Sequence, residues 1–154
     1  MLGNYLITED TTMKAFKKLM AAALVCVMAL TMLTGCALSD NLAEKALVNK
    51  MTSVSTAKYD HDKDLDEAAK EAWNKNKDKE IVTTIEYNKV TYNVVIVKAP
   101  TSKTSEQSSW GTQAGTINKA LVSTSKISDN TIKVGVKMFE GSKDDYAVVV
   151  AQVK

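Results

Sequence analysis

The sequence predicts an α+β domain in which helices pack on both faces of a small antiparallel sheet of three or four strands, an α-β-α sandwich. Three patterns lead to this prediction. Apolar residues recur at helical spacing over residues 43–54 and 65–73. They alternate with polar residues over 81–87 and 132–138, as in strands. Residues 94–97 and 146–153 are apolar on both sides, which indicates a sheet that is covered on both faces.

Three helices are expected. The first and third are expected over residues 42–56 and 114–122, where the helical spacing holds. The second is expected to begin at Asp64, which together with Glu67 has the spacing of a capping box, and to end near Lys75.

Two hairpins supply the strands. The first turns at Asn88-Lys89, which has the length of a two-residue hairpin turn. The second turns in a loop that contains Gly141. A polar loop over residues 101–109 separates the first hairpin from the third helix.

The first part of the chain has the order of a secretory signal peptide. Met13 opens a short basic segment with three lysines, and residues 19–32 are an apolar run interrupted once by a threonine. A membrane-spanning helix needs about 20 apolar residues, so this run is too short for a permanent span. It leads into the segment Leu33-Thr34-Gly35-Cys36.

The segment Leu33-Thr34-Gly35-Cys36 resembles the lipobox of bacterial lipoproteins. The resemblance implies that residues 1–35 are a cleaved signal peptide and that Cys36 becomes the N-terminus. It also implies a covalent diacylglycerol on the Cys36 thiol, with or without an N-acyl lipid such as palmitate, and a location on the outer side of the bacterial cell membrane. The alternative is an ordinary signal peptide or an uncleaved anchor. Met13 is the expected true start, because acidic residues precede it.

The remaining chain is expected to form one domain. Residues 36–42 would be the lipidated cysteine and a short linker, and residues 43–154 the domain itself. The 119 residues after position 35 are enough for one hydrophobic core. Cys26 falls in the signal segment and Cys36 at the lipid site, so no disulfide is expected.

The charge pattern excludes one class of partner. All 20 basic residues are lysines, and after position 35 the chain keeps 17 lysines and 16 acidic residues. A nearly neutral chain without arginine lacks the basic stripe of a nucleic-acid binder. It also lacks a polybasic cluster for membrane lipids, so membrane contact should come from the lipid anchor alone.

Four segments after the signal stand in a family-like order. Residues 47–50 read Leu-Val-Asn-Lys, and residues 65–72 read Leu-Asp-Glu-Ala-Ala-Lys-Glu-Ala. Residues 110–121 begin with Trp-Gly, and residues 133–137 read Lys-Val-Gly-Val-Lys. Their order is similar to that of the CAP superfamily (cysteine-rich secretory proteins, antigen 5 and pathogenesis-related 1). The resemblance covers residues 43–153 and implies a CAP-like sandwich with a cleft.

The family's cleft carries two histidines and two acidic residues, which bind a metal in some members. By the resemblance, the second histidine corresponds to Thr116, and a segment with a glutamate corresponds to Asn93 without that glutamate. Together with Trp110, these residues define the expected cleft, which would have lost its metal ligands. His61 is the one histidine of the chain, matches neither position, and is expected to be an exposed loop residue.

A cluster of acids precedes the second helix. Asp60, Asp62, Asp64 and Asp66, with Glu71 at the twelfth position, have the spacing of EF-hand ligands. The sixth position is a leucine where that loop needs glycine, and acids at a helix N-terminus are stabilised without a metal. No metal, no cofactor other than the lipid and no catalytic residue is therefore predicted.

The expected function is that of a lipid-anchored envelope protein that binds a protein partner or a hydrophobic ligand without catalysis. A first alternative is an envelope domain of the PepSY type, a class associated with peptidase inhibition, because residues 64–75 and 81–98 resemble its helix and hairpin. A second alternative is a hydrolase or metal-dependent enzyme with an unrecognised site. In a CAP-like layout residues 91–98 and the two strands after Ile132 lie in one sheet, with the first two helices on opposite sides of it. In a PepSY-like layout the first hairpin packs on the second helix as an independent unit.

Overall fold

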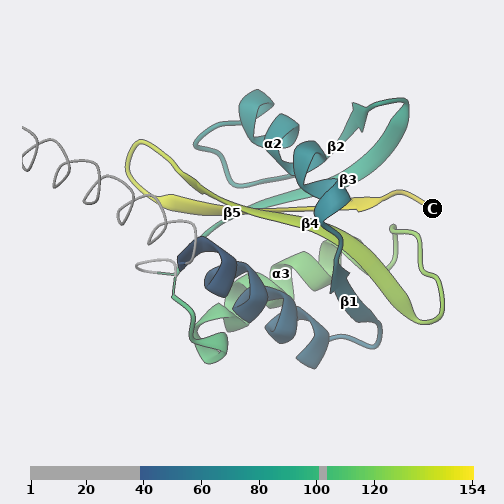
Figure 1. Ribbon diagram of the computed structural model, residues 1–154, viewed down its shortest axis with the longest axis horizontal. Coiled ribbons are helices and arrows are strands. Elements are labelled where there is room, and N and C mark those ends of the chain that lie inside the picture. Colours follow the sequence, from purple (N-terminus) through teal and green to yellow (C-terminus); the bar gives the residue numbers. More distant parts are fainter. Residues whose placement is uncertain (1–38, 101–103) are drawn as a thin grey trace, which may run out of the picture. The chain divides into compact units, whose positions relative to one another are not determined.

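A five-stranded mixed sheet is the centre of the domain (Figure 1). The computed structural model describes residues 39–100 and 104–154, so the signal segment and the lipobox with Cys36 lie outside the described residues. The strands are β1 (Lys58–His61), β2 (Ile81–Tyr87), β3 (Val90–Lys98), β4 (Thr131–Glu140) and β5 (Asp145–Gln152). Their order is β1-β4-β5-β3-β2; β1 is parallel to β4, and the other neighbours are antiparallel.

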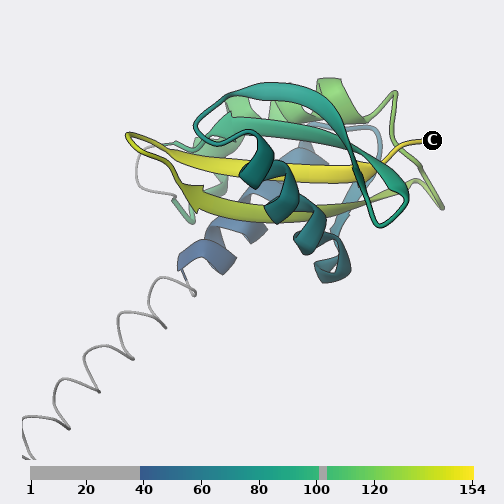
Figure 2. The same cartoon turned by 90° about the horizontal axis from the view of Figure 1, so that it is seen from above.

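Helices cover both faces of this sheet (Figures 1 and 2). One face carries α2 (Asp66–Lys75), which follows the 3-10 turn η1 (Lys63–Leu65). The other face carries α3 (Gly111–Leu121), which follows the 3-10 turn η2 (Gln107–Trp110), and a helix over residues 39–53 that we call the N-terminal helix. The α+β class is therefore confirmed. No helix in the described ranges is long and apolar enough to cross a membrane.

The sheet differs from the expected three or four antiparallel strands. The additional strand is β1, a four-residue segment in which only Tyr59 is buried. It pairs in parallel with β4, from Lys58 opposite Thr131 to His61 opposite Val134. So short a strand shows no alternating pattern, and its partner lies far along the chain with no connecting turn. Neither signal on which the sequence analysis relied could reveal it.

The central strands bury side chains on both faces, as their apolar sequences predict. The core under the N-terminal helix and α3 includes Leu47, Met51, Val95, Trp110, Ile117, Val136 and Val149. The core under α2 includes Ala69, Ala72, Trp73, Ile96, Val148 and Val150. In the second core the indole of Trp73 stacks on Phe139, with ring centroids 5.1 Å apart and an interplanar angle of 8°. Successive residues along β3, and along β5, thus belong to different cores.

The predicted turn of the first hairpin is confirmed. Asn88 and Lys89 both have positive φ angles, 48° and 64°, which a two-residue type I′ hairpin turn requires. The turn fixes a continuous register between β2 and β3, from Tyr87 opposite Val90 to Ile81 opposite Ile96.

The predicted capping box is wrong. The carboxylate of Asp62 accepts a hydrogen bond from the backbone N–H of Asp64 at 3.0 Å and caps η1 instead. The α-helix begins only at Asp66, and Leu65 at its N-cap makes no side-chain hydrogen bond. The intervening 3-10 turn lies directly on β4: a Cβ atom at Gly135 would collide with the carbonyl of Leu65. The capping motif missed this turn because it arises from packing across the sheet.

The layering separates the two family layouts. β3, β4 and β5 share one sheet, and the N-terminal helix and α2 lie on opposite faces of it. The expected layout placed these strands in one antiparallel sheet of three or four strands, whereas the sheet is mixed and five-stranded, and the CAP resemblance stays a prediction. The first hairpin is not an independent unit with α2, as the PepSY alternative expects, because β3 is hydrogen-bonded to β5 and α2 also packs on β4 and β5. Residues 39–42, which belong to the expected linker, are helical.

Candidate functional site

The three residues of the expected cleft do not converge on one site. Trp110 is fully buried, and its indole N–H donates to the carbonyl of Thr104 at 2.9 Å. The Asn93 amide donates to the hydroxyl of Ser125 at 3.2 Å, and Ser125 is itself fully buried. Thr116 alone is exposed and lines a groove on the surface.

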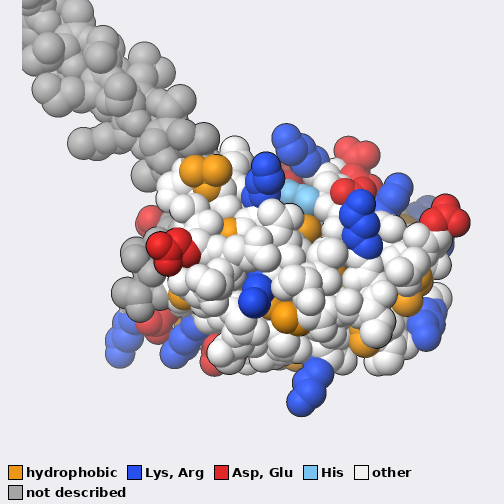
Figure 3. Space-filling view, turned by 90° about the horizontal axis from the view of Figure 1, so that it is seen from below, with side chains coloured by type: hydrophobic (Ala, Val, Ile, Leu, Met, Phe, Trp, Pro, Cys, Tyr) orange, Lys and Arg blue, Asp and Glu red, His pale blue; other side chains and the backbone are white. Residues whose placement is uncertain are grey.

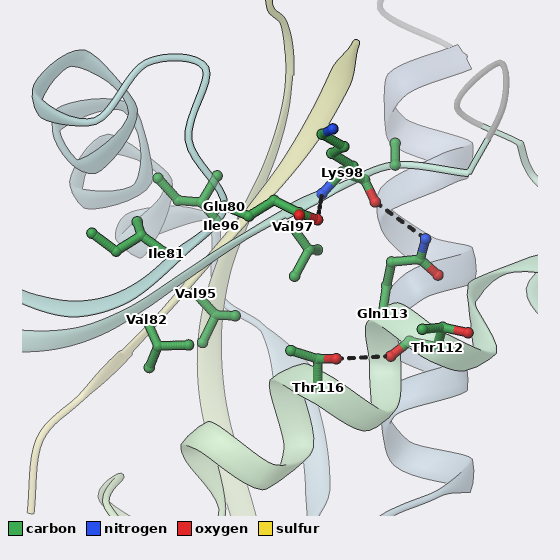
Figure 4. A pocket seen from close by; sticks show the side chains of 11 residues that line it. Glu80, Ile81, Val82, Val95, Ile96, Val97, Lys98, Thr112, Gln113 and Thr116 are labelled. Atoms are coloured by element: carbon green, nitrogen blue, oxygen red, sulfur yellow. Dashed lines mark hydrogen bonds between the residues drawn. The ribbon is translucent and has the colours of Figure 1, made fainter.

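That groove lies between α3 and the first hairpin (Figure 4). Its volume is about 420 Å³, within the range of about 300–1,000 Å³ that small-molecule sites occupy. Val82 and Val95 point into it from β2 and β3, and Thr112, Gln113 and Thr116 face them from α3. The groove therefore has an apolar floor and a polar wall.

The floor of the groove includes an apolar side chain that folding has not covered. Val82 is 60% exposed, whereas its cross-strand partner Val95 is fully buried. Burying a valine side chain stabilises by about 1.5–3 kcal/mol, so an exposed valine in a strand is a surface that a ligand can cover with a gain in free energy. The sequence pattern gave no sign of this, since residue 82 simply occupies a polar-side position of β2.

The upper end of the groove is fixed by two hydrogen bonds to Lys98. The carboxylate of Glu80 accepts from the Lys98 backbone N–H at 3.0 Å, and the Gln113 side-chain N–H donates to the Lys98 carbonyl at 3.1 Å (Figure 4). The Gln113 amide oxygen is buried and has no hydrogen-bond partner among the described residues.

A second candidate is a polar cluster at the opposite edge of the sheet. The Nε2 atom of His61, at the end of β1, lies 2.7 Å from Oδ1 of Asp66, at the start of α2. The same carboxylate oxygen accepts from the backbone N–H of Val136 at 3.1 Å. The pairing of β1 with β4 ends at Val134, and beyond it the Asp66 side chain, instead of a strand, satisfies the backbone N–H of β4. His61 was expected to be an exposed loop residue, but it is the last residue of β1, and its side chain is 21% exposed and paired with Asp66. Figure 3 shows the histidine at the surface among lysine and acidic side chains.

Glu44 of the N-terminal helix completes this cluster. The residue is only 4% exposed, and burial raises the pKa of its carboxyl group to about 7. Lys137 and His61 lower that pKa and Asp66 and Asp40 raise it, all with smaller effects than burial. Glu44 was not predicted as a site residue. It precedes Leu47 and Val48 by three and four positions, and this spacing places it on the same buried face of the helix.

The pKa of His61 is raised as well, chiefly by its hydrogen bond to Asp66. The pair resembles the oriented imidazole of a general base, but such a base needs a nucleophile or substrate proton within hydrogen-bond reach. In the described ranges no serine, threonine or cysteine side chain is hydrogen-bonded to His61. Nor do the described residues contain three His, Cys, Asp or Glu side chains placed to hold a metal ion. What the geometry shows is a joint in which the Asp66 carboxylate connects β1, α2 and β4.

A further hollow of about 600 Å³ lies beside η1 and the start of β4. It is lined by Asp62, Leu65, Lys126, Ser128, Asp129, Thr131, Lys133 and Gln152. Two acids face two lysines there, so the hollow has no preference for one sign of charge.

Comparison of the chain with protein-family models, with curated proteins and with solved structures finds no match. The description of the candidate sites therefore depends on their geometry alone.

Both raised pKa values predict how stability depends on pH. A raised pKa means that the folded state holds its proton more tightly than the unfolded chain, so protons favour folding at Glu44 and at His61. The free energy of unfolding should fall as pH rises from 4.5 through 7, where Glu44 ionises, and as His61 loses its proton above its ordinary pKa of about 6.5. Denaturant unfolding at about pH 5 and about pH 8 measures this difference.

Variants assign the pH dependence to the cluster. Glu44→Gln should flatten it and stabilise the protein at about pH 8, because no buried charge then forms. Glu106→Gln, at an exposed position, is the matched control and should leave the pH dependence unchanged. An unaltered dependence in Glu44→Gln would show that Glu44 does not titrate in this range.

Proposed function

We propose that this chain is an exported, lipid-anchored envelope protein whose CAP-like domain binds a partner without catalysis, in the groove between α3 and the first hairpin. The observation that carries the binding role is the exposed Val82 over the buried Val95, facing the polar wall of α3. An apolar floor with a few polar groups around it is the usual composition of a ligand site.

The anchoring role depends on the lipobox resemblance of Leu33-Thr34-Gly35-Cys36. A thioether-linked diacylglycerol on Cys36 would hold the domain at the membrane, because each buried CH₂ contributes about 0.8 kcal/mol and two chains give stable attachment. The first helix already includes residue 39, so only a few residues would separate the lipid from the folded domain.

A catalytic role has less support. The groove is lined by Glu80 and Lys98, but the Glu80 carboxylate accepts from a backbone N–H, and the Lys98 ammonium group pairs with Asp144 at 3.4 Å. Neither is arranged as a nucleophile with its base. The histidine, at the end of β1, and its carboxylate partner, at the start of α2, lie at the other edge of the sheet.

Replacement of Cys36 tests the anchor. In the full-length chain, Cys36→Ser should abolish incorporation of labelled palmitate and release the protein from the membrane fraction, because the acylated thiol is gone. Cys26→Ser lies in the apolar run of the signal and is the matched control, which should keep the label. Palmitate labelling that persists in Cys36→Ser would contradict the lipid anchor.

Site-specific photo-crosslinking in intact cells tests the groove. Benzoylphenylalanine at position 82 should form an adduct with the partner, and Thr116→Lys in the same chain should remove that adduct by filling the groove with a long charged side chain. The control position is Val54, another exposed valine, which lies outside the groove. Equal adducts at both positions, or adducts that survive Thr116→Lys, would contradict a groove-specific binding role.

A further inference from the structure

We propose that the open edge of β2 binds an extended polypeptide segment, which adds to the sheet as an antiparallel strand and lays alternate side chains over the groove. This inference depends on the proposed function, because it names the occupant of the same groove. Three observations carry it: the direction of the backbone groups of β2, the contrast between the two sheet edges, and the side chains that share the groove face.

The backbone direction follows from hydrogen bonds around β3. The N–H of Lys98 points toward the β2 side, where Glu80 accepts it, whereas the carbonyl of Thr91 points toward the β5 side, where Val153 donates to it. In an antiparallel strand the N–H and C=O of one residue point the same way and alternate along the chain. The backbone N–H and C=O groups of the even-numbered residues of β3 therefore point toward β2.

The register transfers this alternation to β2. Thr83 and Ile85 stand opposite the even-numbered Val94 and Tyr92, so their backbone groups bond β3. The N–H and C=O groups of Val82, Thr84 and Glu86 consequently point away from the sheet, into solvent. Another polypeptide backbone is the ligand that satisfies such a row of donors and acceptors.

The two edges of the sheet differ in how far their backbone groups are covered. At the β4 edge, β1 is only four residues long, and beyond it Asp66 occupies the N–H of Val136. At the other edge, β2 pairs one-to-one with β3 over seven residues, without a bulge, a proline or a lysine. Bulges, prolines and charged side chains, lysine above all, are among the means by which proteins block edge strands, and Glu86 is the one charged residue of β2. The β2 edge carries no bulge, proline or lysine, which is expected of an edge that accepts a strand.

The side chains on the groove face define the chemistry of the occupant. Val82 and Thr84 stand opposite Val95 and Asn93, so Val82, Thr84 and Glu86 share the face that α3 covers only in part. Glu86 is exposed and has no ion pair among the described residues. A fitting strand therefore has a basic residue opposite Glu86, a β-branched residue opposite Thr84 and an apolar residue opposite Val82.

A second copy of this chain fits less well. Full overlap of two antiparallel β2 strands centres on Thr84 and sets Glu86 of one strand opposite Val82 of the other. Each acid then lies over an apolar site without a cation. The charge pattern favours a heterologous segment of the form basic-x-β-branched-x-apolar.

The test uses the full-length chain in detergent micelles and the labelled peptide acetyl-Thr-Lys-Thr-Val-Thr-Val-Thr-amide. Its lysine and two valines would face Glu86, Thr84 and Val82. We expect saturable binding by fluorescence anisotropy, weakened at least about tenfold when both valine nitrogens are methylated, because these N–H groups face β2. Methylation of the third and fifth residues, whose N–H groups face solvent, is the matched control and should weaken binding much less.

Two protein variants complete the test. Thr84→Pro removes one outward N–H while leaving the β2–β3 bonds of Thr83 and Ile85, and should abolish binding. Glu86→Lys should weaken binding of the lysine peptide and restore binding of a peptide with glutamate in that place, a rescue that a misfolded variant could not give.

The outcomes separate this inference from the proposed function. If both methylated peptides bind as tightly as the parent, strand addition is overturned while the groove remains a side-chain site. If no peptide binds, or if the free chain dimerises through β2, the inference is overturned, and the cross-linking result at position 82 decides the groove by itself.

Discussion

The burial of both faces of β3, β5 and β4 is the constraint on which the rest of the structure depends. Val95 and Val149 enter one core while Ile96 and Val148 enter the other, so the sheet is stable only while helices cover both sides. The helices have a finite width, and beyond α3 the face of β2 is left half-covered. The exposed Val82 and the groove follow from that limit, without any residue being strained to make them.

The joint at Asp66 connects the layers that this constraint requires. One carboxylate begins α2, holds His61 at the end of β1 and closes the free edge of β4 at Val136. Glu44 contributes from the opposite layer, and its burial couples the N-terminal helix to the same group of charges. The sheet has only five strands, so two edges need partners. Beyond β1 the Asp66 side chain binds the edge of β4, whereas no strand pairs with the outer edge of β2.

Features that depend on neighbouring residues could be predicted from the sequence, whereas features that arise from packing between distant segments could not. The turn at Asn88-Lys89, the two-sided apolar strands and the α+β class could be predicted, because each depends on neighbours within a few residues. β1 could not, since its pairing with β4 joins distant segments. For the site, the family resemblance named Thr116, which lines the groove, together with Asn93 and Trp110, which do not line it. Val82 and Glu44 depend on which faces the helices leave open or close.

The proposed strand addition requires that the backbone of β2 be open to a partner along one row of residues. Residue-resolved amide hydrogen exchange of the unliganded protein measures this opening. We expect rapid exchange at Val82, Thr84 and Glu86, alternating with strong protection at Thr83 and Ile85. Protection of all five amides to the same degree would mean that the edge is already occupied, and would contradict the proposal that β2 waits for an incoming strand.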